Sequence, residues 1–155
     1  MAFATPAKRE VTEVRHLPWS EMRWDMDATG AHDQVSEEFS RLNLRRVREL
    51  VARRAGIAGV PGDRIDVLVW ATNEIATNAV VHGGGRGRIT ITTTEGGVRV
   101  AVTDWGPGCA GPIANADPGF DAPDGRGLCL TRQLFPGMIV TTGPAGTTMT
   151  VFAAR

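Results

Sequence analysis

The stretch NEIATNAVVHGGG, residues 73–85, decides the fold because it ends a long helix that carries both an apolar and a polar face. Upstream, Pro61-Gly62-Asp63 is a helix start, and the glycines from Gly83 are a helix stop. Between them, apolar and small side chains recur at steps of three and four, which predicts one buried face over residues 63–82. They are Ile65, Leu68, Val69, Thr72, Ile75, Ala76, Ala79 and Val80.

A polar stripe runs beside this apolar face. Glu74, Asn78 and His82 are spaced i, i+4, i+8, so they lie one above another on the helix. A carboxylate and a carboxamide one turn apart can share one ligand or ion, although spacing alone would favour a solvated flank. The small residues around the stripe favour the ligand. They are Ala71, Ala76, Ala79 and the three glycines that follow.

The region before this helix is less regular. We expect residues 1–20 to form a flexible arm, and the alternation at 22–26 predicts a first strand. Residues 27–42 fit either a helix or part of a hairpin. Asn43 is a candidate N-cap for a helix that ends at Gly56.

The second half of the chain predicts strands. Alternating residues at 89–93 and 98–102 flank Gly96-Gly97 and predict a hairpin, and 138–142 with 147–152 predict another. Between the hairpins we expect a long loop from Gly106 to Gly125 and a short helix over 128–135. Helices first and strands later indicate an α+β fold, a two-layer α/β sandwich with an antiparallel or mixed sheet and helices on one face.

Three further motifs could carry chemistry. Asp104-Trp105-Gly106-Pro107-Gly108 follows a strand. An Asp at such a position can hydrogen-bond to the polar edge of a ring, and the glycines let other groups approach closely. Gly125-Arg126-Gly127-Leu128 opens a helix whose first N–H groups could bind phosphate. Gly146-Thr147-Thr148 begins the last strand. Taken singly, these are also an ordinary turn, a loop-to-helix junction and a strand.

Composition excludes several functions. The 155 residues hold 17 Lys plus Arg and 17 Asp plus Glu, and the one lysine is Lys8. A P-loop, which needs a lysine after its glycines, is therefore impossible, and a G-x-S-x-G esterase motif is absent. Zero net charge argues against direct nucleic-acid binding. The N-terminus has no apolar segment typical of a signal or membrane span, so we expect a cytoplasmic protein.

Taken in order, the motifs E-x-x-x-N, D-x-G-x-G, G-x-G-L and G-T-T resemble the GHKL (Bergerat-fold) ATPase superfamily. NEIATNAVVHGGG is similar to its N box, VTDWGPG and GRGLCLTRQL to its two glycine boxes, and GTTMTVF to its closing strand. Within it, the chain looks most like the bacterial anti-sigma-factor serine/threonine kinases. The likeness covers about ninety positions, from Asp63 to Phe152, of a single domain spanning 21–155.

This resemblance implies a role for each motif. Asn78 would ligate Mg²⁺ at the ATP phosphates, and Glu74 would be the general base. Asp104 would accept a hydrogen bond from the adenine amine, with Thr147 assisting through water. Residues 109–124 would form the ATP lid. The other implied ATP-binding residues are Gly106 and Gly108 at the ring, and Gly125, Arg126, Gly127 and Leu128 at the phosphates.

The resemblance implies an anti-sigma factor that phosphorylates a STAS-domain antagonist. Its partners would be a sigma factor and that antagonist, and it could form a homodimer. An alternative is a nucleotide-binding module that sequesters a partner without kinase activity. A split histidine kinase is a weaker hypothesis, because no helix pair with a phosphoacceptor His is evident. The bulky Trp105 in the first glycine box could pack over the lid or the adenine side.

Overall fold

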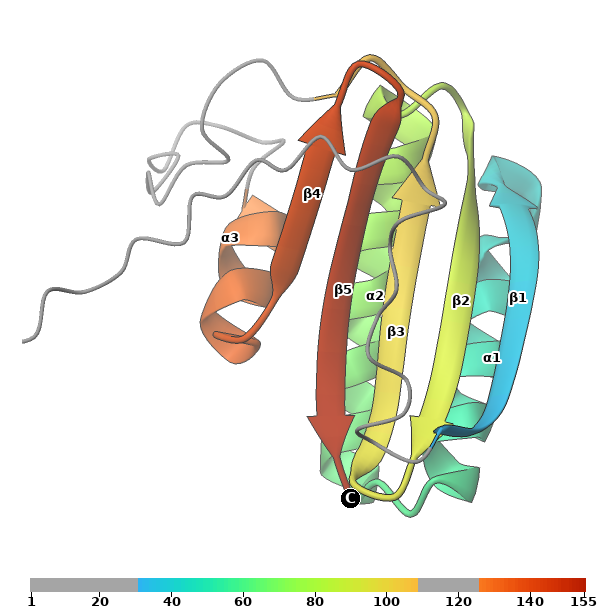
Figure 1. Ribbon diagram of the computed structural model, residues 1–155, viewed down its shortest axis with the longest axis vertical. Helices are drawn as coiled ribbons and strands as arrows, with labels where there is room; N and C mark the ends of the chain where they lie inside the picture. Colours follow the sequence, from blue (N-terminus) through green and yellow to red (C-terminus); the bar gives the residue numbers. More distant parts are fainter. Residues whose placement is uncertain (1–30, 109–125) are drawn as a thin grey trace, which may run out of the picture.

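Five strands form the sheet of the computed structural model, which describes residues 31–108 and 126–155 (Figure 1). Their spatial order is β1-β2-β3-β5-β4, and every pairing among these described strands is antiparallel. Hairpins join β2 to β3 and β4 to β5. The two longer connections are the one from β1 to β2, which contains α1 and α2, and the one from β3 to β4, which contains α3. The strands are β1 Ala31–Ser40, β2 Arg86–Thr94, β3 Gly97–Asp104, β4 Ile139–Gly143 and β5 Gly146–Ala154.

The helices are α1 Leu44–Ile57, α2 Gly62–His82 and α3 Arg126–Leu134, with a short 3-10 turn, Arg41–Asn43, before α1. Figure 1 shows α1 and α2 behind the sheet and α3 beside β4. Among the described residues, no helix is long and apolar enough to cross a membrane. The two-layer α+β sandwich with helices on one face is therefore confirmed.

The core lies between the two layers. Alternate residues of β2 and β3, such as Ile89 and Val100, are buried, as the period-2 pattern predicts. From the helix layer, Val51 and Leu68 are completely buried. The core thus holds α2 firmly on the sheet, which fixes the position of the polar stripe at its C-terminal end.

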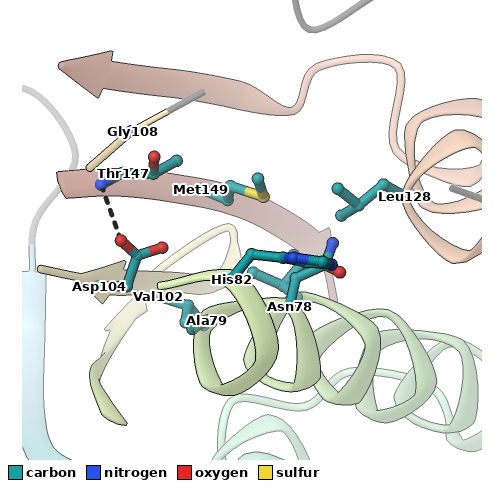
Figure 2. A pocket seen from close by; sticks show the side chains of 10 residues that line it. Asn78, Ala79, His82, Val102, Asp104, Gly108, Leu128, Thr147 and Met149 are labelled. Atoms are coloured by element: carbon teal, nitrogen blue, oxygen red, sulfur yellow. Dashed lines mark hydrogen bonds between the residues drawn. The ribbon is translucent and has the colours of Figure 1, made fainter. Parts of the chain in front are cut away.

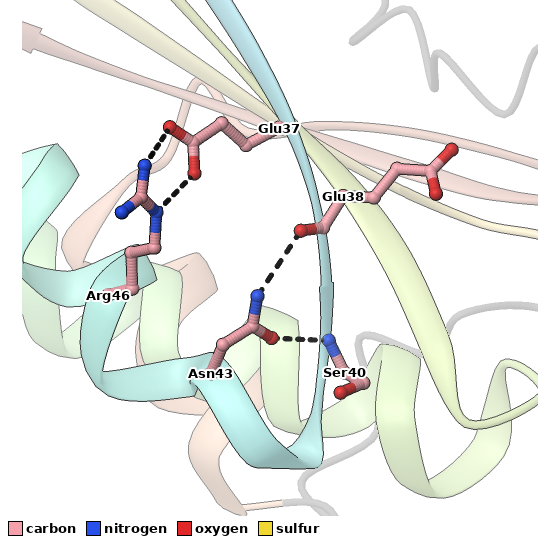
Figure 3. Close-up of polar contacts among 5 residues, drawn as sticks. All are labelled: Glu37, Glu38, Ser40, Asn43 and Arg46. Atoms are coloured by element: carbon pink, nitrogen blue, oxygen red, sulfur yellow. Dashed lines mark hydrogen bonds and ion pairs between the residues drawn. The ribbon is translucent and has the colours of Figure 1, made fainter.

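The stretch that the sequence left open is mostly a strand. Residues 31–40 form β1, which pairs with β2 from Ala31 opposite Thr94 to Ser40 opposite Arg86. Glu37 on this strand forms a two-pronged ion pair with Arg46 of α1, at 2.7 and 2.9 Å (Figure 3). The Arg46 hydrogen bonds lower the pKa of Glu37. The pair ties the edge strand to the helix layer.

The prediction that Asn43 is the N-cap of α1 is confirmed, although its side chain makes no capping hydrogen bond to this helix. Its Oδ1 accepts a hydrogen bond from the Ser40 N–H at 2.6 Å, and its Nδ2 donates to the Glu38 carbonyl (Figure 3). The side chain therefore closes the preceding 3-10 turn in a capping box with Ser40.

The other boundaries differ little from those predicted. Helix α1 passes Gly56 and ends at Ile57, and α3 begins two residues earlier than expected, at Arg126. The two hairpins are confirmed. The arm of residues 1–20, the strand expected at 22–26 and the lid at 109–124 lie outside the described residues.

Candidate nucleotide-binding site

A cavity of about 160 Å³ lies between the C-terminal half of α2 and the sheet (Figure 2). Four elements, α2, α3 and the adjacent ends of β3 and β5, bring predicted residues to its wall. These residues are Asn78, Leu128, Asp104 and Thr147. Its apolar wall could cover the faces of a flat ring while a few polar groups fix the ring's orientation. Ile75, Ala79, Val102 and Met149 form that wall, and His82 and Gly108 complete the lining.

The Asp104 carboxylate is fixed at the end of β3. Its Oδ1 accepts hydrogen bonds from the Gly106 N–H at 3.0 Å and from the Thr147 N–H at 3.2 Å. Figure 2 shows the second contact and places the carboxylate at one end of the cavity. Within the described residues, no protein group donates a hydrogen bond to Oδ2, so it can accept one from a ligand N–H group. The first glycine box and the closing strand are thereby joined through a single oxygen.

The glycines of the DWGPG motif are required by space. A side chain at Gly106 would place its Cβ 2.6 Å from the Gly83 Cα. Gly108 has φ +79°, which L-residues rarely adopt, and a Cβ there would lie 3.1 Å from the Thr142 Oγ1. Both positions let the chain after Asp104 pass close to neighbouring backbone and leave the cavity open.

A second hollow, of about 130 Å³, adjoins the first. It shares Asn78, His82 and Leu128 with the first cavity and adds Glu74 and Gly127. We call the first cavity the adenine-side cavity, because the resemblance implies that Asp104 would bind adenine there. Thr77 and Val81 complete its lining. Glu74 and Asn78 both reach this hollow because one helical turn separates them on α2. The arrangement is suited to the phosphate end of a nucleotide whose ring occupies the first cavity.

The N-terminus of α3 borders this second hollow. A Cβ on Gly127 would lie 2.9 Å from Glu74 Cδ and closer still to Oε2, so only glycine lets the two helices approach here. The first N–H groups of a helix have no partners inside the helix and attract anions. This position therefore suits a phosphate group. Gly125 and the side chain of Arg126, which the sequence also assigned to the phosphates, lie outside the described residues.

Two residues occupy places that the motifs left uncertain. His82 lines both hollows, so it does more than end the helix. Trp105 does not line the adenine-side cavity; it is 41% exposed, and the guanidinium carbons of Arg86 and Arg88 lie 5.4 and 5.7 Å from its ring centroid. It thus makes cation–π contacts with β2 rather than covering the adenine position.

Sequence reasoning missed the apolar wall and Gly83. The wall residues have the same spacing as ordinary core positions, so no signal distinguished Val102 or Met149 from their neighbours. Gly83 was interpreted as a helix stop and as one of three glycines that favour a ligand, but not as a contact of Asp104. Its packing against the DWGPG motif could have been suspected only if the two segments were known to meet.

Mg²⁺ commonly keeps several waters and uses few protein ligands when it is bound with nucleotide phosphates. Among residues 31–108 and 126–155, no group of three or more His, Cys, Asp or Glu side chains forms a metal cluster. The donors at the second hollow, the Asn78 amide oxygen with Glu74 nearby, fit an ion whose other ligands are phosphates and water.

An α2 helix with E-x-x-x-N above a cavity that ends at a strand-end Asp defines a GHKL-type ATPase fold. The family of histidine kinase-like ATPase domains matches residues 40–152, and the chain belongs to it. Family membership implies ATP binding. A comparison with curated proteins finds no significant match.

Solved structures share the fold. One contains the RsbU and RsbW domains of Rv1364c from Mycobacterium tuberculosis, with 20% identity and a TM-score of 0.54 over 79% of this chain. This chain spans about a third, 33%, of that one. Another is the histidine kinase domain of a blue-light activated kinase from Erythrobacter litoralis, with 21% identity and a TM-score of 0.48. The match covers 83% of this chain and 71% of the histidine kinase chain.

Proposed function

We propose that this protein is an ATP-dependent serine/threonine kinase and anti-sigma factor that phosphorylates a STAS-domain antagonist. The observation that carries the kinase proposal is the position of Glu74 beside Asn78 in the hollow next to the adenine-side cavity. A domain that only held nucleotide would need the ring pocket and a phosphate site, but it would not need a carboxylate at the phosphate end.

In this proposal the adenine ring enters the cavity beside Asp104. Oδ2 accepts a hydrogen bond from the exocyclic amine, while Oδ1 stays bound to Thr147 and Gly106. Met149 and Ile75 contribute apolar surface to the wall of this cavity. Since the carboxylate is already fixed by two backbone N–H groups, little side-chain entropy is lost when the base binds.

The phosphates would extend from the ring site into the second hollow, toward the first turn of α3. Asn78 would hold Mg²⁺ there through its amide oxygen. The ion would neutralise charge on the phosphate oxygens, which is the contribution that phosphoryl transfer needs most. The protein's own part is positioning: α2 and α3 set the distance between Asn78 and the Gly127 N-terminal turn.

Glu74 is the general base of the proposed reaction. It accepts the proton of a serine or threonine hydroxyl as that oxygen bonds to the γ-phosphorus and the bond to the β–γ bridging oxygen breaks, which releases ADP. General bases contribute about 10²- to 10⁴-fold to such rates. Glu74 is partly exposed and lines a hollow that opens at the surface, so an acceptor side chain can reach it.

The partners follow from the family resemblance, and the fold supports them. The M. tuberculosis structure that contains RsbU and RsbW domains has the same fold over 79% of this chain. A protein-binding switch also agrees with the balanced charge, 17 cationic against 17 acidic residues. A STAS-domain protein would supply the acceptor hydroxyl, and a sigma factor would be the protein held when the antagonist is phosphorylated.

The proposal can be tested by incubating the full chain with γ-³²P-ATP, Mg²⁺ and STAS-domain proteins encoded near its gene. We expect label on a serine or threonine of one of them, and release of a co-purified sigma factor by the unlabelled antagonist. Tight ATP binding with no transfer to any partner would contradict the kinase proposal and favour a nucleotide-binding module that sequesters a partner.

A further inference from the structure

Gly83 is a buried residue immediately after α2 whose backbone does not require glycine. Its φ and ψ are −103° and 22°, which other residues also adopt. Its N–H donates to the Ala79 carbonyl, as at many helix ends. The reason for glycine must therefore be space.

The space around Gly83 is filled by the adenine-site carboxylate. A Cβ at this position would lie 2.5 Å from Asp104 Cβ and closer still to Asp104 Cγ. It would also lie 2.6 Å from the Ala79 carbonyl oxygen. Real Cβ contacts this short essentially never occur, so a methyl group at residue 83 has to displace Asp104 or the end of α2.

Asp104 is also held by contacts away from Gly83. Gly106 N–H and Thr147 N–H both donate to Oδ1, and Gly106 itself packs on the Gly83 backbone. The carboxylate is thus held between two backbone donors and the flat surface that Gly83 presents. A shift imposed from the Gly83 side would lengthen one or both of these hydrogen bonds and turn Oδ2 away from the cavity.

We propose that Gly83 is a positioning residue that sets the adenine specificity of the site by holding the Asp104 carboxylate in register with the base. This inference rests on the proposed function, since it assumes that the cavity takes the adenine ring of ATP. It adds a residue to that site: Gly83 makes a third contact to Asp104, from the helix end, beside the N–H groups of Gly106 and Thr147.

The test compares ATP with purine riboside triphosphate, which lacks only the exocyclic amine, on the full-length chain. A hydrogen bond to a charged group corresponds to a preference of about 10- to 100-fold. We expect wild type to prefer ATP by that factor and Gly83→Ala to lose most of it, while binding the analogue within about threefold of wild type. Gly62→Ala at the other end of α2, where a Cβ meets nothing within 4 Å, should keep the preference.

A Gly83→Ala protein that still prefers ATP as wild type does would overturn the positioning role. A wild type that binds both nucleotides equally would also overturn it, since Asp104 would then make no hydrogen bond that distinguishes the exocyclic amine. If wild type bound neither nucleotide, the proposed function would be refuted, and this inference with it. The ratio of the two affinities separates these results, because a general loss of structure weakens both nucleotides together.

A second measurement covers the case in which Gly83→Ala is too unstable for binding studies. Asp104→Gly removes two of the three atoms nearest to the new methyl, Asp104 Cβ and Cγ, and leaves the third, the Ala79 oxygen. We therefore expect Gly83→Ala to lower Tm much less in the Asp104→Gly background than in wild type. An equal drop in both backgrounds would show that residue 83 acts only on the helix end, which would overturn the proposal.

Discussion

The Glu74 carboxylate lies against the backbone of Gly127, at the point where the first turn of α3 meets the C-terminal half of α2. A Cβ on Gly127 would approach the carboxylate carbon to 2.9 Å, and Oε2 more closely. The proposed base and the proposed phosphate-binding turn are therefore in contact. This contact sets where a transferred phosphoryl group and the residue that activates its acceptor can meet.

A methyl group at Gly127 would separate the two helices at this contact. We expect Gly127→Ala to lower phosphate transfer by about tenfold or more, because even a 1 Å misplacement of catalytic groups can cost about 10²-fold. The measurement is the single-turnover rate at saturating ATP. Gly137→Ala is the matched control, since a Cβ there meets nothing within 4 Å, and it should transfer at the wild-type rate. Equal rates for the two variants would contradict the role of this contact.

Asn78→Ala should remove the dependence of ATP affinity on Mg²⁺. The substitution deletes the proposed amide ligand but leaves Asp104 and the apolar wall intact, so ADP or ATP without metal should bind as before. Titration calorimetry with and without Mg²⁺ measures both. Asn73→Ala, which lies on the same helix and only loses a 2.9 Å hydrogen bond from Arg48, should keep the Mg²⁺ effect. Retention of that effect in Asn78→Ala would refute the metal assignment.

Asp104→Asn separates the structural role of Oδ1 from the proposed role of Oδ2 in recognising the base. The amide oxygen can still accept from Thr147 and Gly106, whereas the amide nitrogen would face the exocyclic amine donor to donor. We expect ATP affinity to fall by about 10- to 100-fold while Tm changes little. Fluorescence competition with a labelled nucleotide and a thermal melt would measure the two quantities. A large loss of Tm with unchanged affinity would reverse the interpretation.

The ion pair between Glu37 and Arg46 should make a small, pH-dependent contribution to stability. The Arg46 hydrogen bonds hold the pKa of Glu37 below its ordinary value near 4.5, so the stabilisation is present above that value. It is lost as the pH falls through the lowered pKa. Glu37→Gln should therefore be less stable than wild type near neutral pH and equal to it in strong acid, by urea unfolding. A difference that persists unchanged into acid would contradict the ion-pair explanation. In an Arg46→Met background, the stability difference caused by Glu37→Gln should no longer depend on pH.

The sequence predicted the parts of the molecule whose signals are local. The apolar spacing and the flanking Pro61 and Gly83 predict helix α2. The alternation around Gly96-Gly97 predicts the β2–β3 hairpin. Strand β1 was ambiguous because Val35 and Phe39 are spaced as in a helix, yet both lie on the core side of a strand paired with β2. The pairing, which is a non-local contact, decided between the two.

The candidate site shows the same division. Glu74 and Asn78 could be placed together from helical spacing, and the motif order linked them to Asp104. The two hydrogen bonds on Asp104 Oδ1 and the packing of Gly83 against Asp104 could not be foreseen, since they depend on the register of β3 with β5 and on where α2 ends over the sheet. Spacing within one element is readable in sequence, whereas contact between elements is set by the packed core.

The central claim is that Glu74 acts in catalysis rather than in binding, and Glu74→Gln tests it most directly. The variant keeps the shape of the side chain and removes its ability to take a proton. With γ-³²P-ATP and a STAS-domain acceptor, ATP affinity should stay within about threefold of wild type while phosphate transfer falls by about 100-fold or more. Glu49→Gln, at an exposed position of α1, should match wild type in both. Transfer by Glu74→Gln at the wild-type rate would contradict the account.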